Sequence, residues 1–180
     1  MMKTTQILIA GFGGQGILFA GKFLAYKGLM EDLQVSWLPS YGPEMRGGTA
    51  NCNVILSESP VGSPIVTEPD VLIAMNLPSL QKYVDSVVPG GQIYLDSSLI
   101  DEKVERTDVE VFYIPATQMA KDNGIATLAN MIIVGALLEH NSELSFEGVD
   151  AVVSKLVPPK KAALVELNMK ALLLGKEYSA

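Results

Sequence analysis

Short apolar runs, each followed by a turn and then by helical periodicity, constrain the fold of this chain more than any other sequence feature. Gln6 to Ala10 leads into a glycine cluster and a predicted helix from Gln15 to Met30. Val71 to Met75 is followed by Asn76 and by a predicted helix from Pro78 to about Val88. Continuously apolar strands are typical of sheets that are covered on both faces. The pattern therefore predicts strands that alternate with helices.

Four further segments are predicted as strands: Val35 to Leu38, Thr49 to Ser57, Gln92 to Leu95 and Val109 to Ile114. In Thr49 to Ser57 the residues at positions 50, 52, 54 and 56 are apolar, which predicts one buried and one half-exposed face. Alternating strands and helices are joined by right-handed crossovers and form mostly parallel sheets. The predicted fold class is α/β, with a Rossmann-like, predominantly parallel sheet and helices on both faces.

The chain after Pro115 is predicted to form a helical C-terminal part. Three helices are expected there: Thr127 to Glu139, Ser145 to Leu156 and about Lys160 to Leu174. The first residue of each of the first two helices is a candidate N-cap, and Gly175 is a candidate stop for the third. Because the chain has 180 residues and no linker-like segment, residues 1–180 are predicted to form a single domain.

Composition and charge argue against several classes of protein. A hydrophobic fraction of 48% with 18% charged residues favours a well-buried globular domain. The net charge of −7 disfavours nucleic-acid binding, which depends on clustered Lys and Arg. The most apolar stretch, Leu128 to Leu138, is shorter than the roughly 20 residues of a membrane span. Since the N-terminal residues do not match a signal peptide, we expect a cytoplasmic protein.

Gly11-Phe12-Gly13-Gly14-Gln15-Gly16 matches the pattern G-x-G-x-x-G between a predicted strand and a predicted helix. Glycines there permit a tight turn, and the free N–H groups of the helix favour an anion. A dinucleotide site would also need an acidic residue at the end of the second strand, where Val35 to Pro39 contains none. Three interpretations stay open: a structural turn, a site for an anion or partner subunit, and a dinucleotide site. The candidate residues are Gly11, Gly13, Gly14, Gln15 and Gly16.

A second loop, Pro39 to Gly48, combines adaptable apolar side chains with both signs of charge in a backbone restricted by Gly and Pro. Loops of this kind commonly serve recognition. This loop, the glycine loop and the segment Asn76 to Ser79 all follow predicted strands, and sites in parallel sheets collect at the carboxyl ends of strands. We therefore predict that the glycine loop is joined in one anion-binding or subunit-interface site by Tyr41, Glu44, Met45, Arg46 and Asn76.

Taken with the glycine loop, the segment Trp37 to Cys52 closely resembles the gamma subunit of 2-oxoacid:ferredoxin oxidoreductases, especially the 2-oxoglutarate and branched-chain types of the pyruvate/ketoacid family. The resemblance extends through Gly62-Ser63-Pro64, Met75-Asn76-Leu77-Pro78-Ser79 and Ser97-Ser98-Leu99. It is strong over about the first hundred residues and looser in the helical remainder.

The resemblance implies a subunit of an enzyme that oxidatively decarboxylates a 2-oxoacid, with 2-oxoglutarate as the expected substrate, passes the acyl group to coenzyme A and reduces ferredoxin. In that family thiamine diphosphate and iron–sulfur clusters are held by other subunits, here the thiamine-bearing alpha and beta chains and a ferredoxin-like delta chain. The residues agree, because a cubane cluster needs about four thiolates and the chain has a single cysteine. We expect no catalytic or metal-ligating residue and no cofactor bound by this chain alone.

Within such a complex, Arg46 is expected to pair with an acidic group of a thiamine-bearing subunit. A coenzyme A phosphate at the turn from Gly13 to Gly16 is the alternative. Two other classes stay open: a self-contained NAD-dependent oxidoreductase, and a scaffold or binding module that forms homodimers through its apolar helical tail. Cys52, Met119, Met131 and Met169 are interpreted as core residues, and His140 is interpreted as a helix-end residue. Asp96 is interpreted as a turn former, with a ligand contact as the alternative.

Overall fold

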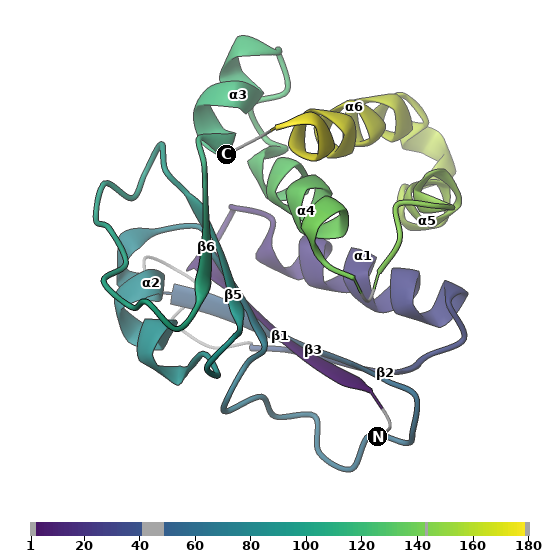
Figure 1. The fold of residues 1–180 in the computed structure, drawn as a ribbon. Helices are drawn as coiled ribbons and strands as arrows, with labels where there is room; N and C mark the ends of the chain where they lie inside the picture. Colours follow the sequence, from purple (N-terminus) through teal and green to yellow (C-terminus); the bar gives the residue numbers. More distant parts are fainter. Residues whose placement is uncertain (1–2, 41–48, 143, 179–180) are drawn as a thin grey trace.

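The structure, a computed structural model, describes residues 3–40, 49–142 and 144–178, and its centre is a six-stranded mixed sheet (Figure 1). The strands are β1 (Thr4–Phe12), β2 (Gln34–Pro39), β3 (Thr49–Ser57), β4 (Val71–Ala74), β5 (Gln92–Asp96) and β6 (Glu110–Ile114). Their order across the sheet is β2-β3-β1-β4-β5-β6. All six strands predicted from the sequence are therefore present, within two residues of the expected bounds.

Strand direction is parallel from β1 through β4 and β5 to β6, as expected for strands joined by crossovers. β3 is the exception, because it pairs antiparallel with both β1 and β2. A short connection between β2 and β3 leaves no room for the crossover that two parallel neighbours need. The α/β prediction is confirmed, with one reversed strand that the apolar pattern did not indicate.

Helices cover both faces of the sheet, as predicted (Figure 1). The α-helices are α1 (Ile17–Met30), α2 (Leu77–Tyr83), α3 (Ala116–Asp122), α4 (Ala129–His140), α5 (Val149–Leu156) and α6 (Ala163–Glu177), with short 3-10 helices at Val84–Ser86 and Pro159–Lys161. One face packs against α1 and α4, which α3, α5 and α6 back. The other packs against α2 and the connections around Val66, Ile100 and Val104.

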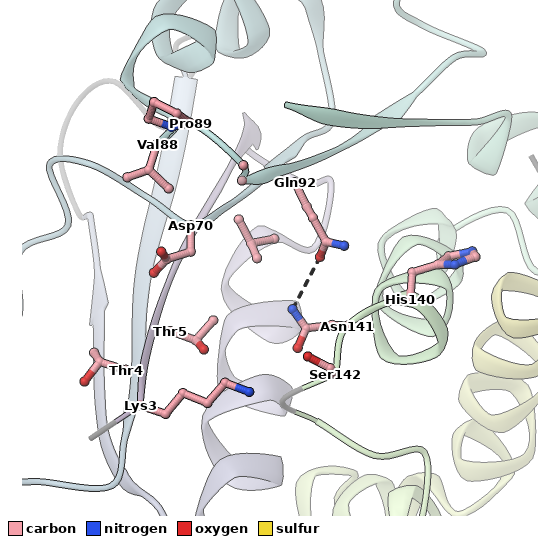
Figure 2. Close-up of a pocket in the computed structure, with 13 residues that line it drawn as sticks. Lys3, Thr4, Thr5, Asp70, Val88, Pro89, Gln92, His140, Asn141 and Ser142 are labelled. Carbon is pink, nitrogen blue, oxygen red and sulfur yellow. Dashed lines mark hydrogen bonds between the residues drawn. The ribbon is translucent and has the colours of Figure 1, made fainter. Parts of the chain in front are cut away.

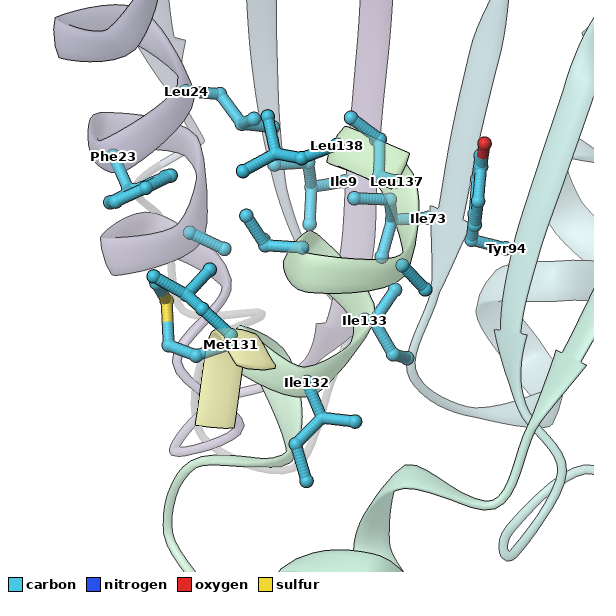
Figure 3. Packing of buried hydrophobic residues seen from close by; sticks show 14 of the residues in the cluster. Ile9, Phe23, Leu24, Ile73, Tyr94, Met131, Ile132, Ile133, Leu137 and Leu138 are labelled. Carbon is cyan, nitrogen blue, oxygen red and sulfur yellow. The ribbon is translucent and has the colours of Figure 1, made fainter. Parts of the chain in front are cut away.

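The larger core lies between the sheet and helices α1 and α4 (Figure 3). Phe23 and Leu24 of α1 and Ile133 of α4 are fully buried against Ile9 and Ile73 of the sheet. Residues 129–138 of α4 are all buried, so this helix is apolar all round and confirms the interpretation of Leu128 to Leu138 as a buried helix. Among the described residues, no helix combines the length and apolarity that crossing a bilayer requires.

Helices α4 and α6 approach so closely that their backbones touch at two glycines. A Cβ on Gly175 would lie 1.8 Å from the carbonyl oxygen of Ile132, and one on Gly135 would lie 2.1 Å from that of Leu172. The prediction that Gly175 stops the last helix is wrong, because α6 continues through it to Glu177. Gly175 is needed for the close approach of two helices, a requirement that only the tertiary structure reveals.

Several predicted helix ends are also wrong. Neither Thr127 nor Ser145 caps a helix, since α4 starts after Leu128 and α5 after Gly148 without side-chain caps. α6 begins at Ala163 because Pro159 to Lys161 forms a separate 3-10 turn, and α2 ends at Tyr83 before a further 3-10 turn. Tertiary packing outweighs local capping preferences at these positions.

A buried ion pair joins the end of α1 to the segment before α5. Lys27 is 2% exposed, and its ammonium pairs with Glu31 one turn later. Glu31 Oε1 also accepts hydrogen bonds from the backbone N and Oγ of Ser145, at 3.1 and 2.9 Å. Burial alone would raise the pKa of Glu31, but the hydrogen bonds from Lys27 and Ser145 outweigh it and lower the pKa below its ordinary value of 4.5.

Glu31→Gln is expected to reduce the free energy of unfolding by about 2 kcal/mol at pH 7, because it leaves the Lys27 ammonium buried without its counter-ion. A carboxylate whose pKa is lowered by folding stabilises the protein above the unfolded-state pKa, and that contribution is lost as the pH falls through the folded-state value. Urea denaturation at pH 7 and in steps below pH 4.5 should show the difference between variant and wild type shrinking with acid.

The matched control is Glu139→Gln, which breaks the exposed pair with Lys176 at 4.0 Å. We expect this variant to cost less than about 0.5 kcal/mol at any pH. Equal losses in the two variants would contradict the structural role given to Glu31.

Candidate functional site

The glycine loop lies at the carboxyl end of β1, where the chain turns into α1. Phe12, Gly13 and Gly14 are exposed, while Gly14 and Gly16 have φ values of 95° and 74°. These left-handed values favour glycine. Gly16 is the N-cap residue of α1 and gives the helix no side-chain cap, so the first N–H groups of the helix have no side-chain acceptor in the part of the chain that the structure describes. An exposed turn with helical N–H groups can accept an anion.

Gln15 closes the glycine loop on itself. Its Oε1 accepts a hydrogen bond from the backbone N–H of Phe12 at 2.6 Å, and its Nε2 donates to the carbonyl oxygen of Met75 at 2.9 Å. A Cβ on Gly11 would lie 2.7 Å from the same Oε1, so Gly11 leaves space for this clamp. Of the predicted site residues, Gln15 therefore holds the ends of β1 and β4 together through its hydrogen bonds, and Gly11 provides the space for its side chain.

Asn76 lies beside the glycine loop at the carboxyl end of β4. Its Oδ1 caps α2 by accepting from the backbone N–H of Ser79 at 2.8 Å. Asn76 and Ser79 are 2% and 0% exposed, yet Asn76 Nδ2 and Ser79 Oγ have no hydrogen-bond partner among the described residues. Buried donors without acceptors are costly. Ser79 was not among the predicted site residues, although it follows Asn76 in the same Asn-Leu-Pro-Ser segment.

The second predicted loop begins and ends at the edge that carries the glycine loop. Pro39 of β2 pairs with Cys52 of β3, and Thr49 of β3 pairs with Phe12 of β1. As predicted, Asn76 and both ends of the second loop therefore lie at the edge of the sheet that carries the glycine loop. The predicted site residues Tyr41, Glu44, Met45 and Arg46 lie outside the described residues.

Asp96, at the carboxyl end of β5, is fully buried and stabilises the fold through hydrogen bonds. Its carboxylate accepts from the backbone N–H of Ser98 at 3.1 Å and from the backbone N–H and hydroxyl of Thr117 at 3.2 and 2.5 Å. These bonds anchor the first turn of α3 to the sheet. The structural interpretation of Asp96 is confirmed, because its hydrogen bonds serve two neighbouring chain segments.

Cys52 lies in the core of β3, as predicted, and is 0% exposed. Burial raises the pKa of its thiol to about 12, and the Trp37 indole offsets only part of that rise. A thiol held protonated in an apolar site is a poor nucleophile and a poor metal ligand. Within the described residues, His, Cys, Asp and Glu side chains form no group of three that could hold a metal ion.

A polar pocket of about 380 Å³ opens at the opposite, amino-terminal end of the parallel strands (Figure 2). Asp70, Gln92 and Asn141 line it, and Asn141 donates to Gln92 Oε1 at 3.4 Å. His140 ends α4 beside the pocket and stacks on Phe112 at 4.6 Å, in agreement with its interpretation as a helix-end residue. Ligands of open α/β sheets bind at the carboxyl ends of strands, so the glycine-loop edge is the stronger candidate site.

Comparison with known proteins gives matches along almost the whole chain. Residues 6–178 match the family model described as pyruvate ferredoxin/flavodoxin oxidoreductase. The 2-oxoglutarate synthase subunit KorC of Methanothermobacter marburgensis is 35% identical over 179 residues, which cover 96% of this chain and 95% of KorC. The ketoisovalerate oxidoreductase subunit VorA of Methanothermobacter thermautotrophicus is 37% identical over 178 residues, and the match covers 97% of this chain but 36% of VorA.

Two solved structures share the fold. The gamma subunit of a keto/oxoacid ferredoxin oxidoreductase from Geobacter sulfurreducens has a TM-score of 0.80 and 30% identity, and the match covers 96% of both chains. The 2-oxoglutarate:ferredoxin oxidoreductase from Magnetococcus marinus has a TM-score of 0.86 and 28% identity, and the match covers 97% of this chain and 30% of that one. The chain thus spans about a third of its longer relatives, and it belongs to the pyruvate ferredoxin/flavodoxin oxidoreductase family.

Proposed function

We propose that this chain is the gamma subunit of a multi-subunit 2-oxoacid:ferredoxin oxidoreductase, which converts a 2-oxoacid and coenzyme A to acyl-CoA and carbon dioxide while it reduces ferredoxin. The observation that carries the proposal is the end-to-end match with two gamma-sized proteins, KorC and the Geobacter gamma subunit, at 95% and 96% of their lengths. Full-length KorC relatives favour 2-oxoglutarate as the substrate of the complex.

The residues of this chain do not fit an iron–sulfur cluster. A cubane cluster takes about four thiolates, whereas the single cysteine of the sequence is buried and protonated in the core. The proposal therefore places the clusters and thiamine diphosphate on the alpha, beta and delta chains. The gamma chain supplies a docking edge, which consists of the glycine loop and the segment after β2, and the thiamine-bearing subunits dock against it. The proposal includes a cytoplasmic location for this enzyme.

The docking edge combines apolar contact with anion-binding capacity. Phe12, the last residue of β1 and the second of the glycine loop, is 41% exposed, which is unusual for a phenylalanine at the end of a buried strand. Aromatic side chains and arginines contribute most to subunit interfaces. Phe12 and Arg46 are therefore the residues of this edge that we expect to contact the thiamine-bearing subunits, with Arg46 facing an acidic group.

Arg46→Ala tests this docking edge. We expect the variant to assemble with the alpha and beta chains about tenfold to hundredfold more weakly, because a charge-assisted hydrogen bond contributes about 1.5–3 kcal/mol. Assembly is measured by sedimentation of the reconstituted complex, and ferredoxin reduction with 2-oxoglutarate and coenzyme A is measured beside it. Lys121→Ala, which removes an exposed cation on α3, is the control. Normal assembly and turnover of Arg46→Ala would remove Arg46 from the interface, and oxidation of a 2-oxoacid by the isolated chain would refute the subunit assignment.

A second candidate role of the same edge is to hold a phosphate or carbonyl group of coenzyme A. Asn76 Nδ2 and Ser79 Oγ are buried donors without partners among the described residues, and Met75, next to Asn76, accepts a hydrogen bond from Gln15 of the glycine loop. The structure of the Magnetococcus enzyme contains coenzyme A. In calorimetry with the assembled complex, Ser79→Ala is expected to weaken coenzyme A binding about tenfold without lowering the thermal midpoint of the chain. Unchanged affinity would assign the edge to subunit contact alone.

A further inference from the structure

Two amide side chains attach the glycine loop to the rest of the domain. Gln15 belongs to the loop and fastens its first half, through the hydrogen bonds to Phe12 and Met75. Asn130, in the first turn of α4, fastens its last residue, because Asn130 Nδ2 donates to the carbonyl oxygen of Gly16 at 3.1 Å. A Cβ on Gly16 would lie 2.5 Å from the same Nδ2, so the loop and α4 are in direct contact.

The middle of the loop, between these two attachments, is exposed. Gly13 and Gly14 face solvent, and a Cβ on Gly14 would meet no atom within 4 Å. Glycine has the largest backbone freedom of all residues, so this segment would sample many conformations if it were released. A backbone hydrogen bond from Gln15 N to Phe12 O at 3.2 Å closes the turn, and the side chain of Gln15 reinforces it.

Asn130 has a cost for the fold of the isolated chain. It is the single polar residue in the buried stretch 129–138 of α4, it is 4% exposed, and its Oδ1 has no partner among the described residues. The carbonyl oxygen of Gly16 does not depend on Asn130, because it also accepts from the backbone N–H of Ala20 at 3.0 Å. A leucine of similar shape would avoid the unsatisfied buried acceptor. Stability alone therefore does not account for this asparagine, whereas attachment of the loop does.

We propose that Gln15 and Asn130 are positioning residues of the docking edge, which hold the glycine loop, and with it Phe12, in the conformation that the thiamine-bearing subunits bind. The proposal rests on the gamma-subunit assignment and on the docking edge. Gln15 acts through its bonds to Phe12 and Met75, and Asn130 acts from a buried position. A recognition loop that is already ordered binds more tightly than a mobile one, because less conformational entropy is lost on binding.

The order of the loop in the isolated chain is the first test. Gln15→Met and Asn130→Leu remove the two attachments and keep the size of each side chain about the same. In both variants the NMR order parameters of the Gly13 and Gly14 amides are expected to fall from about 0.85 to below about 0.6. Asn130→Leu is also expected to keep or raise the thermal midpoint of the chain. Unchanged order of both amides would show that these side chains do not position the loop.

Assembly with the alpha and beta chains is the second test. Each variant is expected to assemble about tenfold more weakly, the factor that corresponds to ordering the backbone of about one residue. Ferredoxin reduction per assembled complex is expected to stay unchanged. In combination with Phe12→Ala, either variant is expected to weaken assembly by less than about threefold more, because the residue that the loop positions is then missing. A further tenfold loss in the double variants would overturn the proposal.

Asn123→Leu is the matched control. Asn123 makes the same type of bond as Asn130, from Nδ2 to the carbonyl oxygen of Met119 at 2.9 Å, but it lies at the end of α3. This variant should leave the order parameters of the glycine loop and the strength of assembly unchanged.

The two proposals fail in different ways. If the wild-type chain does not assemble with thiamine-bearing subunits, the gamma-subunit assignment is wrong and the positioning role is wrong with it. If the wild type assembles, and both variants assemble equally well although their loops are mobile, the positioning role alone is wrong. A lowered thermal midpoint with an ordered loop would show that Gln15 or Asn130 only supports the fold, and would also overturn the proposal.

Discussion

Gly175→Ala is expected to reduce the free energy of unfolding by about 3 kcal/mol or more, although alanine is the better helix former by about 1 kcal/mol. The new Cβ would lie 1.8 Å from the carbonyl oxygen of Ile132 and 2.9 Å from the backbone nitrogen of Ala136. Both atoms belong to the backbone of α4, so no side chain can move aside, and α6 must separate from α4. Urea denaturation followed by circular dichroism measures the loss.

Gly62→Ala is the control for this substitution, because a Cβ at position 62 meets no atom within 4 Å. It should leave the free energy of unfolding unchanged within about 0.5 kcal/mol. Stabilisation by Gly175→Ala would show that helix propensity outweighs packing here, and would contradict the close approach of α4 and α6. The free energy of unfolding of a typical domain is about 5–15 kcal/mol, so the loss predicted for Gly175→Ala is a large share of it.

Asp96→Ala is expected to reduce the free energy of unfolding by about 3 kcal/mol. The substitution leaves the backbone N–H groups of Ser98 and Thr117 and the Thr117 hydroxyl without the acceptor that they share in the folded protein. Hydrogen bonds to a charged group contribute more than neutral ones, and donors left buried add a further cost. Asp96→Asn should reduce the free energy of unfolding by less, since the amide keeps one oxygen acceptor. Thermal unfolding of both variants measures the order wild type, Asn, Ala.

The control is Asp122→Ala, which removes an exposed carboxylate that accepts from Gln118 at 2.7 Å. Its expected cost is at most about 0.5 kcal/mol. If Asp96→Ala were as stable as wild type while the assembled enzyme lost activity, Asp96 would serve a ligand and not the fold.

The sheet could be predicted because its signals are local. Gln6 to Ala10 and Val71 to Met75 are continuously apolar, and such runs followed by a helix indicate buried parallel strands. The direction of β3 could not be predicted in this way, because its apolar alternation is the same whichever way the strand runs. The roles of Gly135 and Gly175 depend on a partner helix more than 35 residues away in the sequence and leave no local trace.

In the candidate site, too, the features with a local sequence signal could be predicted, and the contacts between distant residues could not. Glycines at positions 14 and 16 carry positive φ values that a G-x-G-x-x-G motif after a strand already indicates. The clamp from Gln15 to Met75 and the contact from Asn130 to Gly16 join residues 60 and 114 positions apart. Such contacts exist only once the chain has folded, so sequence patterns identified the glycine loop but not the contacts that Gln15 and Asn130 make with it.

The reversed direction of β3 has a consequence for how members of this family can diverge. Because β2 and β3 are antiparallel neighbours, the segment between Pro39 and Thr49 leaves and re-enters the sheet at the same edge. Added or deleted residues there need not alter any crossover helix or the pairing of the strands, and lengthening a loop costs little entropy. On the docking edge that we propose, a change in this one connection would therefore alter which chains the protein recognises and leave the rest of the fold as it is.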